Sequence, residues 1–330
     1  MKIAICFIAF LIPLFTFSQM SDSTYAEKLG FPKGAKVVIL HVDDAGMSFD
    51  SDAGTIQALT KGAATSCSVM MPCPWVPHFV TFLKGNPEID AGLHLTLTSE
   101  WGAYRWGPLA GKAAVPGLVD STGSLWASVE DVVKHATPDE VEKEITAQLD
   151  LARTMGFEPT HLDSHMGTLF ASPAFMERYI RLGITHHIPV MMPAGHATLI
   201  AAQNNIGAEQ LSQLQAVGKM LWAAGLPVLD DLHNATYNWQ PPDNLKTPYK
   251  PNYKTPQYIA ALKEMKPGLT MLIMHCTAPT EVFKEISDSG PSRKADLEAM
   301  LDPAFKKALQ KEGIIVTTWR EVQQRRAALK

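Results

Sequence analysis

Two adjacent carboxylates end an apolar run near the start of the chain. The run Val37–Val42 has the composition of a core strand, and Asp43, Asp44 and Gly46 follow it closely. Sheets and barrels expose reactive groups at the carboxyl ends of their strands. Two neighbouring like charges repel unless a cation, a proton or solvent separates their fields. The pair therefore indicates a chemical site, and an exposed turn is the alternative interpretation.

A second polar group contains three chemically active side chains at alternate positions. They are His161, Asp163 and His165. In a strand, residues two apart share a face, so the spacing predicts that all three project towards one cavity. Imidazole is a common metal ligand, and a neighbouring carboxylate can orient the ring. A set of hydrogen-bonded histidines at a strand end is the alternative.

A further histidine interrupts the apolar run Ala91–Leu97. Alone, His94 would be a core residue with its hydrogen bonds satisfied. Combined with Asp44 and His165, it would complete a set of two histidines and one carboxylate that leaves coordination positions open for water and substrate. This combination favours a catalytic metal site.

His275 follows another apolar run, Leu269–Met274, and its position at a strand end suits a proton donor. A buried carboxylate, Asp163 or Asp231, is expected to hold its ring. An exposed histidine without a catalytic role is the alternative.

The loop 99–108 comes directly after the strand that carries His94, so it is expected to lie over the site. Aromatic rings in such a loop can stack on sugar faces, or they can simply pack the loop onto the domain. The candidate substrate contacts are Trp101, Tyr104, Arg105 and Trp106.

Short apolar runs alternate with helical patterns along the chain, which predicts one α/β domain built as a barrel or a wound sheet. The helix predicted from Pro138 to Met155 has a capping box of Thr137 and Glu140, and Gly156 ends it. We interpret Gln240–Pro256 as a surface loop. The expected strands are Val37–Val42, Thr65–Met70, Ala91–Leu97, Thr160–Ser164, Ile188–Met192, Pro227–Asp230, Leu269–Met274 and Ile314–Thr318.

The first residues are typical of a secretory signal peptide. Lys2 precedes the apolar run Ile3–Phe17, which is shorter than the about 20 residues of a membrane span. We expect a signal peptide over 1–18, an extension over 19–35 and the main domain over 36–330. The mature protein would then be secreted or periplasmic, with no membrane attachment.

Composition limits the partners. The 330 residues include 29 basic and 33 acidic ones, for a net charge of −4, and no basic run suggests nucleic acid. A neutral small or polymeric ligand fits better. After signal cleavage three cysteines remain, and Cys67 and Cys73 could bridge in an oxidising compartment. The oligomeric state stays open.

With these motifs, the chain resembles the YdjC/ChbG-type carbohydrate deacetylases, relatives of the NodB-like polysaccharide deacetylases, approximately from Lys36 to Arg320. The family pattern Asn-Ala-Asp-Asp-Phe-Gly corresponds to His41–Gly46, and Gly-Leu-His-Leu to Gly92–Leu95. Thr-His-x-Asp-Ser-His is matched in full by Thr160–His165. A final His-Pro-Gly element is represented only by Met274-His275-Cys276.

The resemblance implies a distorted (β/α) barrel and a metal-dependent hydrolase that removes N-acetyl groups from an amino sugar or an N-acetylated oligosaccharide. The metal, Zn²⁺ or Mg²⁺ and otherwise Mn²⁺ or Co²⁺, would be held by Asp44, His94 and His165. Asp43 would be the base for metal-bound water and His275 the acid, with His161 and Asp163 supporting the ligands. Gly167 and Cys276-Thr277 depart from the family pattern, which leaves the sugar open and weakens the role of His275.

Other functions are compatible with parts of the pattern. A glycoside hydrolase could use Asp43 or Asp44 with a second carboxylate, but would not explain three convergent histidines. A non-catalytic carbohydrate-binding protein could retain the fold. A non-haem iron oxygenase shares the ligand set, but depends on oxygen and a cosubstrate.

Overall fold

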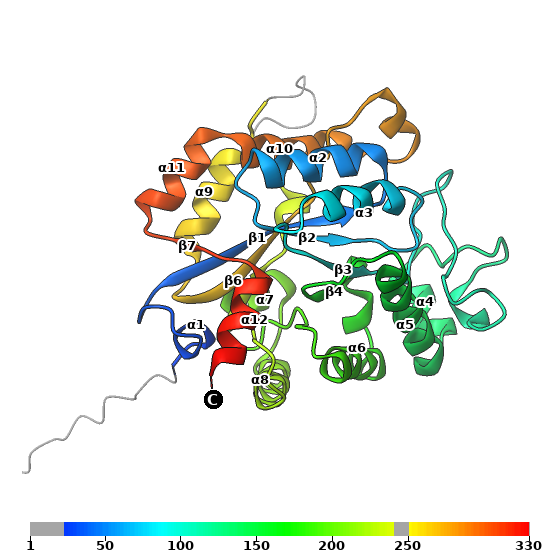
Figure 1. Cartoon of the computed structure of the whole chain (residues 1–330), viewed down its shortest axis with the longest axis horizontal. Coiled ribbons are helices and arrows are strands. Elements are labelled where there is room, and N and C mark those ends of the chain that lie inside the picture. Colours follow the sequence, from blue (N-terminus) through cyan, green and yellow to red (C-terminus); the bar gives the residue numbers. More distant parts are fainter. Residues whose placement is uncertain (1–22, 241–250, 330) are drawn as a thin grey trace, which may run out of the picture.

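The computed structural model describes residues 23–240 and 251–329. The predicted signal peptide lies outside the described residues, as does most of the loop predicted over 240–256. Strands and helices alternate along much of the chain, and the strands form one curled sheet (Figure 1). The strands are β1 (Lys36–Ala45), β2 (Ser66–Val69), β3 (Ala91–Leu95), β4 (Leu162–Ser164), β5 (Asp231–His233), β6 (Gly268–Met274) and β7 (Ile315–Val316).

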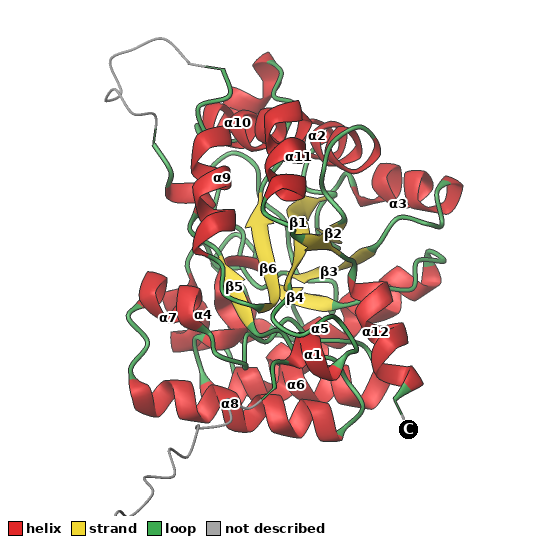
Figure 2. Cartoon of the chain, turned by 90° about the vertical axis from the view of Figure 1, so that its left-hand side faces the viewer, coloured by secondary structure: helices red, strands yellow, loops and turns green. Residues whose placement is uncertain are grey.

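Helices surround the sheet, and within the described residues none is long and apolar enough to cross a membrane (Figure 2). The α-helices are α1 (Tyr25–Lys28), α2 (Phe49–Thr60), α3 (Val76–Gly85), α4 (Val129–His135), α5 (Pro138–Thr154), α6 (Pro173–His186), α7 (Thr198–Asn204), α8 (Ala208–Ala223), α9 (Thr255–Glu264), α10 (Gly290–Leu301), α11 (Pro303–Lys311) and α12 (Trp319–Ala328). The 3₁₀ turns are η1 (Pro116–Leu118), η2 (His165–Phe170), η3 (Thr236–Asn238) and η5 (Glu281–Glu285).

The sheet is parallel in all of its described strand pairs, with the order β4-β3-β2-β1-β6-β5 and β7 beside the start of β1. In the central strand, Val42 lies opposite Cys67 of β2 and Met274 of β6. The carboxyl ends of the strands therefore meet at one edge. The curled single-domain sheet confirms the predicted distorted (β/α) barrel.

Two predicted strands are wrong in detail. Residues 188–192 and 227–230 run alongside the sheet but form only the isolated bridges Leu162↔Val190 and Pro193↔Leu229. Pro189, Pro193 and Pro227 lie in or beside these segments, and proline has no N–H to donate to a strand ladder. The barrel is consequently only partly closed on this side.

Both faces of β1 are buried, which explains its continuous apolar run. Val38, Leu40 and Val42 pack into the larger core, whereas Val37 and Ile39 point into a smaller core on the other face. Burying each such side chain contributes about 1.5–3 kcal/mol. Since strand side chains alternate, the residues at 41 and 43 continue the row of Val37 and Ile39.

Helix α5 fixes the loop that follows β3. Its capping box and its apolar face match the prediction, and its end at Thr154 is one residue earlier than expected. Buried Glu144 accepts hydrogen bonds from the backbone of Leu109 and Ala110, at 3.1 and 2.9 Å. Gln148 accepts one from the backbone of Thr96 at 3.0 Å. The helix thus holds the loop at both ends.

Candidate active site

The end of β1 delivers two carboxylates to the edge of the sheet. Asp43 and Asp44 belong to the strand itself, which extends three residues beyond the predicted end. Asp44 has a φ of 66°, a left-handed conformation that costs energy in most non-glycine residues. Such strained residues persist where the surroundings fix them, often at functional sites. The left-handed backbone turns the Asp44 side chain away from the side that it would take in a regular strand.

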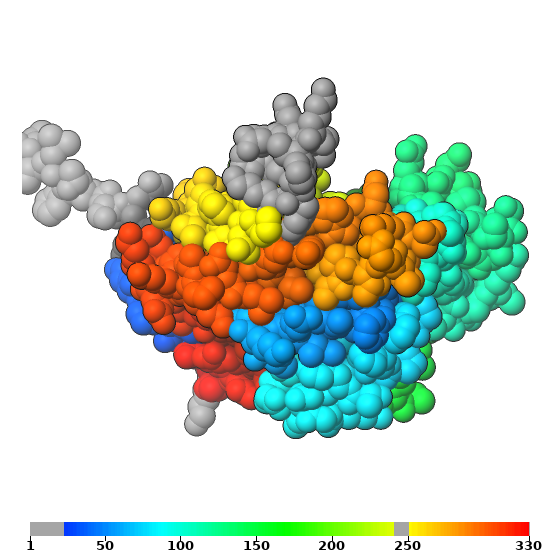
Figure 3. All heavy atoms as spheres, turned by 90° about the horizontal axis from the view of Figure 1, so that it is seen from above, coloured from blue at the N-terminus to red at the C-terminus, as the bar shows by residue number. Residues whose placement is uncertain are grey.

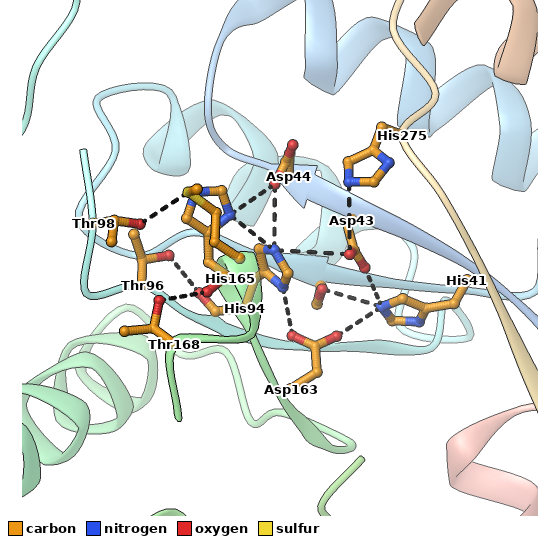
Figure 4. Close-up of polar contacts among 12 residues, drawn as sticks. His41, Asp43, Asp44, His94, Thr96, Thr98, Asp163, His165, Thr168 and His275 are labelled. Carbon is orange, nitrogen blue, oxygen red and sulfur yellow. Dashed lines mark hydrogen bonds and ion pairs between the residues drawn. The ribbon is translucent and has the colours of Figure 1, made fainter. Parts of the chain in front are cut away.

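Three expected metal ligands converge at this edge (Figure 4). Asp44 Oδ1 is 3.3 Å from His94 Nε2 and 3.4 Å from His165 Nδ1, and these two nitrogens are 3.2 Å apart. Donors on one tetrahedral ion at about 2.0–2.2 Å are about 3.3–3.6 Å apart. Asp44 Oδ1 is also buried without a hydrogen-bond partner in the described part of the chain. The residues fit a divalent metal ion.

Each ligand is held by a partner at its opposite atom. Asp163 Oδ1 lies 2.6 Å from His94 Nδ1, and Glu100 Oε1 lies 3.1 Å from His165 Nε2. Partners of this kind fix the tautomer and the orientation of a ligating histidine. Asp44 is likewise held through its second oxygen, which accepts a 2.6 Å hydrogen bond from an arginine of α10. The three donor atoms are therefore preorganised.

That arginine, Arg293, is a buried cation inside the site. Burial opposes the ionisation of Asp44, but Arg293 and the two histidines keep the pKa of Asp44 well below its ordinary value. Burial also favours a neutral His165, yet Glu100 and Asp44 raise its pKa to about 9. An ion must displace a proton from this ring, so metal binding is expected to weaken in acid.

The two groups expected to move protons face each other beside the ligands. Asp43 Oδ2 is 3.8 Å from His94 Nε2 and 3.9 Å from His275 Nε2. Burial is the largest influence on His275 and lowers its pKa, although Asp44 and Asp43 oppose it. A neutral imidazole therefore stands next to the carboxylate.

The expected carboxylate partner of His275 is not found. Asp163 contacts His94, and Asp231 accepts hydrogen bonds from the start of α7. His275 Nδ1 is buried without a hydrogen-bond partner among the described residues. The expectation failed because Asp163 and Asp231 lie on β4 and β5, each already committed to a neighbouring group.

His161 does not project into the site with its two neighbours. Its Nε2 is 3.8 Å from Asp163 Oδ2, and its ring stacks on Trp319 of the smaller core, with ring centroids 5.1 Å apart. His161 and Asp163 nevertheless share one side, as strand alternation predicts, because both lie against the His41 ring. His161 lies behind Asp163, on the side away from the ligands.

The loop after β3 is held mainly by its own contacts. Trp106 is buried and donates to the Thr98 carbonyl at 2.9 Å, and Tyr104 donates to the Met47 carbonyl at 2.6 Å. Arg105 forms an ion pair within the loop region. These contacts favour the packing interpretation for three of the four candidate residues. Trp101 differs, because its half-buried ring lies 5.8 Å from the Arg293 guanidinium.

Three residues of the site had no predicted role. His41 lies on the same face of β1 as Asp43, a relationship that strand alternation already contained. Glu100 lies in the loop after β3, where the candidate residues were three aromatic residues and Arg105. Arg293 comes from α10, far along the chain, and no spacing rule connects it with Asp44. Figure 3 shows α10 (orange) beside α2 (blue), the helix that follows the strand end carrying Asp44.

Comparisons with known proteins match this architecture. A family model described as YdjC-like protein matches residues 37–311. A carbohydrate deacetylase of Thermus thermophilus is 31% identical over 300 residues, covering 90% of this chain and 97% of that protein. A chitooligosaccharide deacetylase of Yersinia enterocolitica is 34% identical over 135 residues, 39% of this chain and 49% of that protein. A solved structure from Enterococcus faecalis V583 has a TM-score of 0.69 at 19% identity, covering 87% of this chain and 99% of that one, and shows the same fold.

Proposed function

Because this chain belongs to the YdjC-like family, we propose that it is a metal-dependent hydrolase that removes N-acetyl groups from an amino sugar or an N-acetylated oligosaccharide. Relatives named carbohydrate deacetylase and chitooligosaccharide deacetylase support this substrate class. The observation that carries the proposal is the convergence of Asp44, His94 and His165 beside the carboxylate of Asp43.

Asp44, His94 and His165 would hold the ion. When bound, a divalent ion lowers the pKa of a water molecule and polarises an amide carbonyl. One carboxylate and two imidazoles suit Zn²⁺ or Mg²⁺, with Mn²⁺ or Co²⁺ as further candidates. Asp163 and Glu100 keep the two rings oriented, and Arg293 leaves one oxygen of Asp44 for the ion.

Proton transfer is assigned to Asp43 and His275. Asp43 accepts a proton from the attacking water while the carbonyl carbon gains a new C–O bond. His275 is neutral at rest, so it must gain a proton before it can act as an acid. We assign Asp43 as the source of this proton, because its Oδ2 lies 3.9 Å from His275 Nε2. His275 then protonates the amine nitrogen as the C–N bond breaks, which releases acetate and a free amino group.

We also propose that the protein is exported, with residues 1–18 removed as a signal peptide. The support is the pattern of Lys2, the apolar run to Phe17 and the polar Ser18-Gln19. Intact mass measurement of the exported protein tests this, and a mass that includes the first 18 residues would contradict it.

The function is tested by a product screen across N-acetylated mono-, di- and oligosaccharides. Acetate and free amines should appear in equal amounts, with no new reducing ends. New reducing ends without acetate would identify a glycoside hydrolase, and sugar binding without either product would identify a non-catalytic binding protein. Asp43→Asn, purified in parallel, controls for contaminating deacetylases.

A further inference from the structure

His41 contacts both of the carboxylates that flank His94. It is fully buried on β1, two residues before Asp43. Its Nε2 lies 2.9 Å from Asp163 Oδ2 and 3.2 Å from Asp43 Oδ1 (Figure 4). Asp163 uses its other oxygen to hold His94, and Asp43 is the proposed base. His41 Nε2 thus contacts both Asp43, the proposed base, and Asp163, which orients His94.

The two carboxylate oxygens that face His41 have few other ways to be compensated. Asp163 Oδ2 and Asp43 Oδ1 are buried, and apart from the rings of His41 and His161 no donor among the described residues reaches them. A buried, uncompensated carboxylate is costly, and a nearby cation offsets that cost. Burial favours a neutral His41, yet Asp163 and Asp43 raise its pKa to about 9. The ring therefore carries a positive charge at neutral pH.

The ring also contacts two serines of the neighbouring strand, one at each of its nitrogens. His41 Nδ1 lies 3.1 Å from Ser66 Oγ, and Nε2 lies 3.1 Å from Ser68 Oγ. Both serines belong to β2, which pairs directly with β1. The neighbouring strand thereby sets the angle at which the imidazole meets the two carboxylates.

We infer that His41 is a positioning residue that bridges Asp43 and Asp163, and so holds the base and the carboxylate behind His94 in one arrangement. The inference rests on the proposed function and adds a residue to its site. The family pattern quoted above has an asparagine where this chain has His41.

A second cation is the competing explanation, because His41, His161 and Asp163 place three possible ligand atoms within 4.8 Å. The distances favour the ion-pair bridge. Asp163 Oδ2 is 2.9 Å from His41 Nε2 but 3.8 Å from His161 Nε2. The His161 ring is also stacked on Trp319, nearly parallel at 16°.

The test compares His41→Leu, His41→Asn and His161→Asn. His161 is the matched control, because its ring is equally buried and 4.9 Å from that of His41. Loss of a residue that orients a ligand typically costs about 10- to 100-fold in activity or metal affinity. We expect His41→Leu to lower kcat by about that factor with little change in KM. His41→Asn should retain more activity, since an amide still donates, and His161→Asn should lose less than His41→Leu.

Two further measurements do not depend on activity. Metal analysis should find one ion per chain in the wild type and in both His41 variants. ¹⁵N NMR at pH 7.5 should show an imidazolium signal that His41→Asn removes. A near-normal kcat in His41→Leu, equal losses in the two His41 variants, a neutral His41 ring, or a second ion lost with His41 would each overturn the inference. If the wild type deacetylates no sugar, the proposed function fails, while the ion count and the NMR signal still test the bridge.

Discussion

His275 Nε2 lies 3.9 Å from Asp43 Oδ2, on the neighbouring strand of the sheet. The register of β1 and β6 explains this proximity. Val42 and Met274 are partners, Asp43 follows Val42, and His275 follows Met274. The order of the sheet thus brings together a carboxylate and an imidazole that are far apart in the sequence.

His275→Ala tests the assigned proton donor. General acid catalysis contributes about 10²–10⁴-fold, so kcat should fall by that range while KM changes much less. Steady-state kinetics on an N-acetylated oligosaccharide measures both constants. Near-normal kcat in the variant would mean that another group protonates the leaving amine.

Asp43→Asn and Asp44→Asn should separate proton transfer from metal binding. Asp43→Asn should abolish most turnover and leave the bound metal nearly unchanged, because Asp43 is not a ligand in this account. Asp44→Asn should reduce both. Metal analysis alongside acetate release measures the pair, and equal metal loss in the two variants would show that their roles are assigned incorrectly.

Two tryptophans of the same loop should differ in what they affect. Trp106 is 4% exposed, so Trp106→Ala should cost about 3–5 kcal/mol of stability. Trp101→Ala should instead raise KM about two- to tenfold, because a stacking contact with a sugar is worth about 0.5–1.5 kcal/mol. Chemical denaturation and kinetics measure the two effects. An unchanged KM for Trp101→Ala would remove Trp101 from the substrate site.

Protonation of His233 should destabilise the protein in acid. Burial lowers the pKa of His233 to about 4, against 6.5 for an ordinary histidine. Its folded form is therefore neutral, and the stability that this contributes is present above pH 6.5 and lost as the pH falls towards 4. Between pH 7.5 and 5 the wild type should lose about 2 kcal/mol relative to His233→Gln. Parallel stability curves for the two proteins would contradict this.

Much of the site could be predicted from the sequence because parallel strands end at a common edge. Asp44, His94 and His165 each lie at the end of such a strand, and they converge in the structure. Asp163 could be placed beside them for the same reason. Strand alternation also contained the position of His41, although no role had been assigned to it.

Other parts depend on contacts that no local pattern records. Arg293 reaches Asp44 from a helix 249 positions further along the chain. Two apolar runs that contain Pro189 and Pro227 form only isolated bridges. Proline cannot donate to a strand ladder, and the sequence does not show which backbone donors the ladder needs. Tyr104 and Arg105 likewise donate hydrogen bonds to the carbonyls of Met47 and Leu125, which are distant in the sequence.

Two cysteines that spacing could pair are not joined in the structure. Cys67, Cys73 and Cys276 are all buried and free in the described chain. Cys67 lies within β2, whereas Cys73 lies in the turn before α3. The possible bridge between Cys67 and Cys73 is therefore absent from this structure.

The most direct test of the account is acetate release by protein that has been stripped of metal with a chelator and then supplied with single divalent ions. We predict that the stripped protein releases no acetate, that about one equivalent of a suitable ion per chain restores release, and that Asp44→Asn is not restored. Undiminished acetate release by protein shown to contain no bound ion would contradict the proposed metal-dependent mechanism.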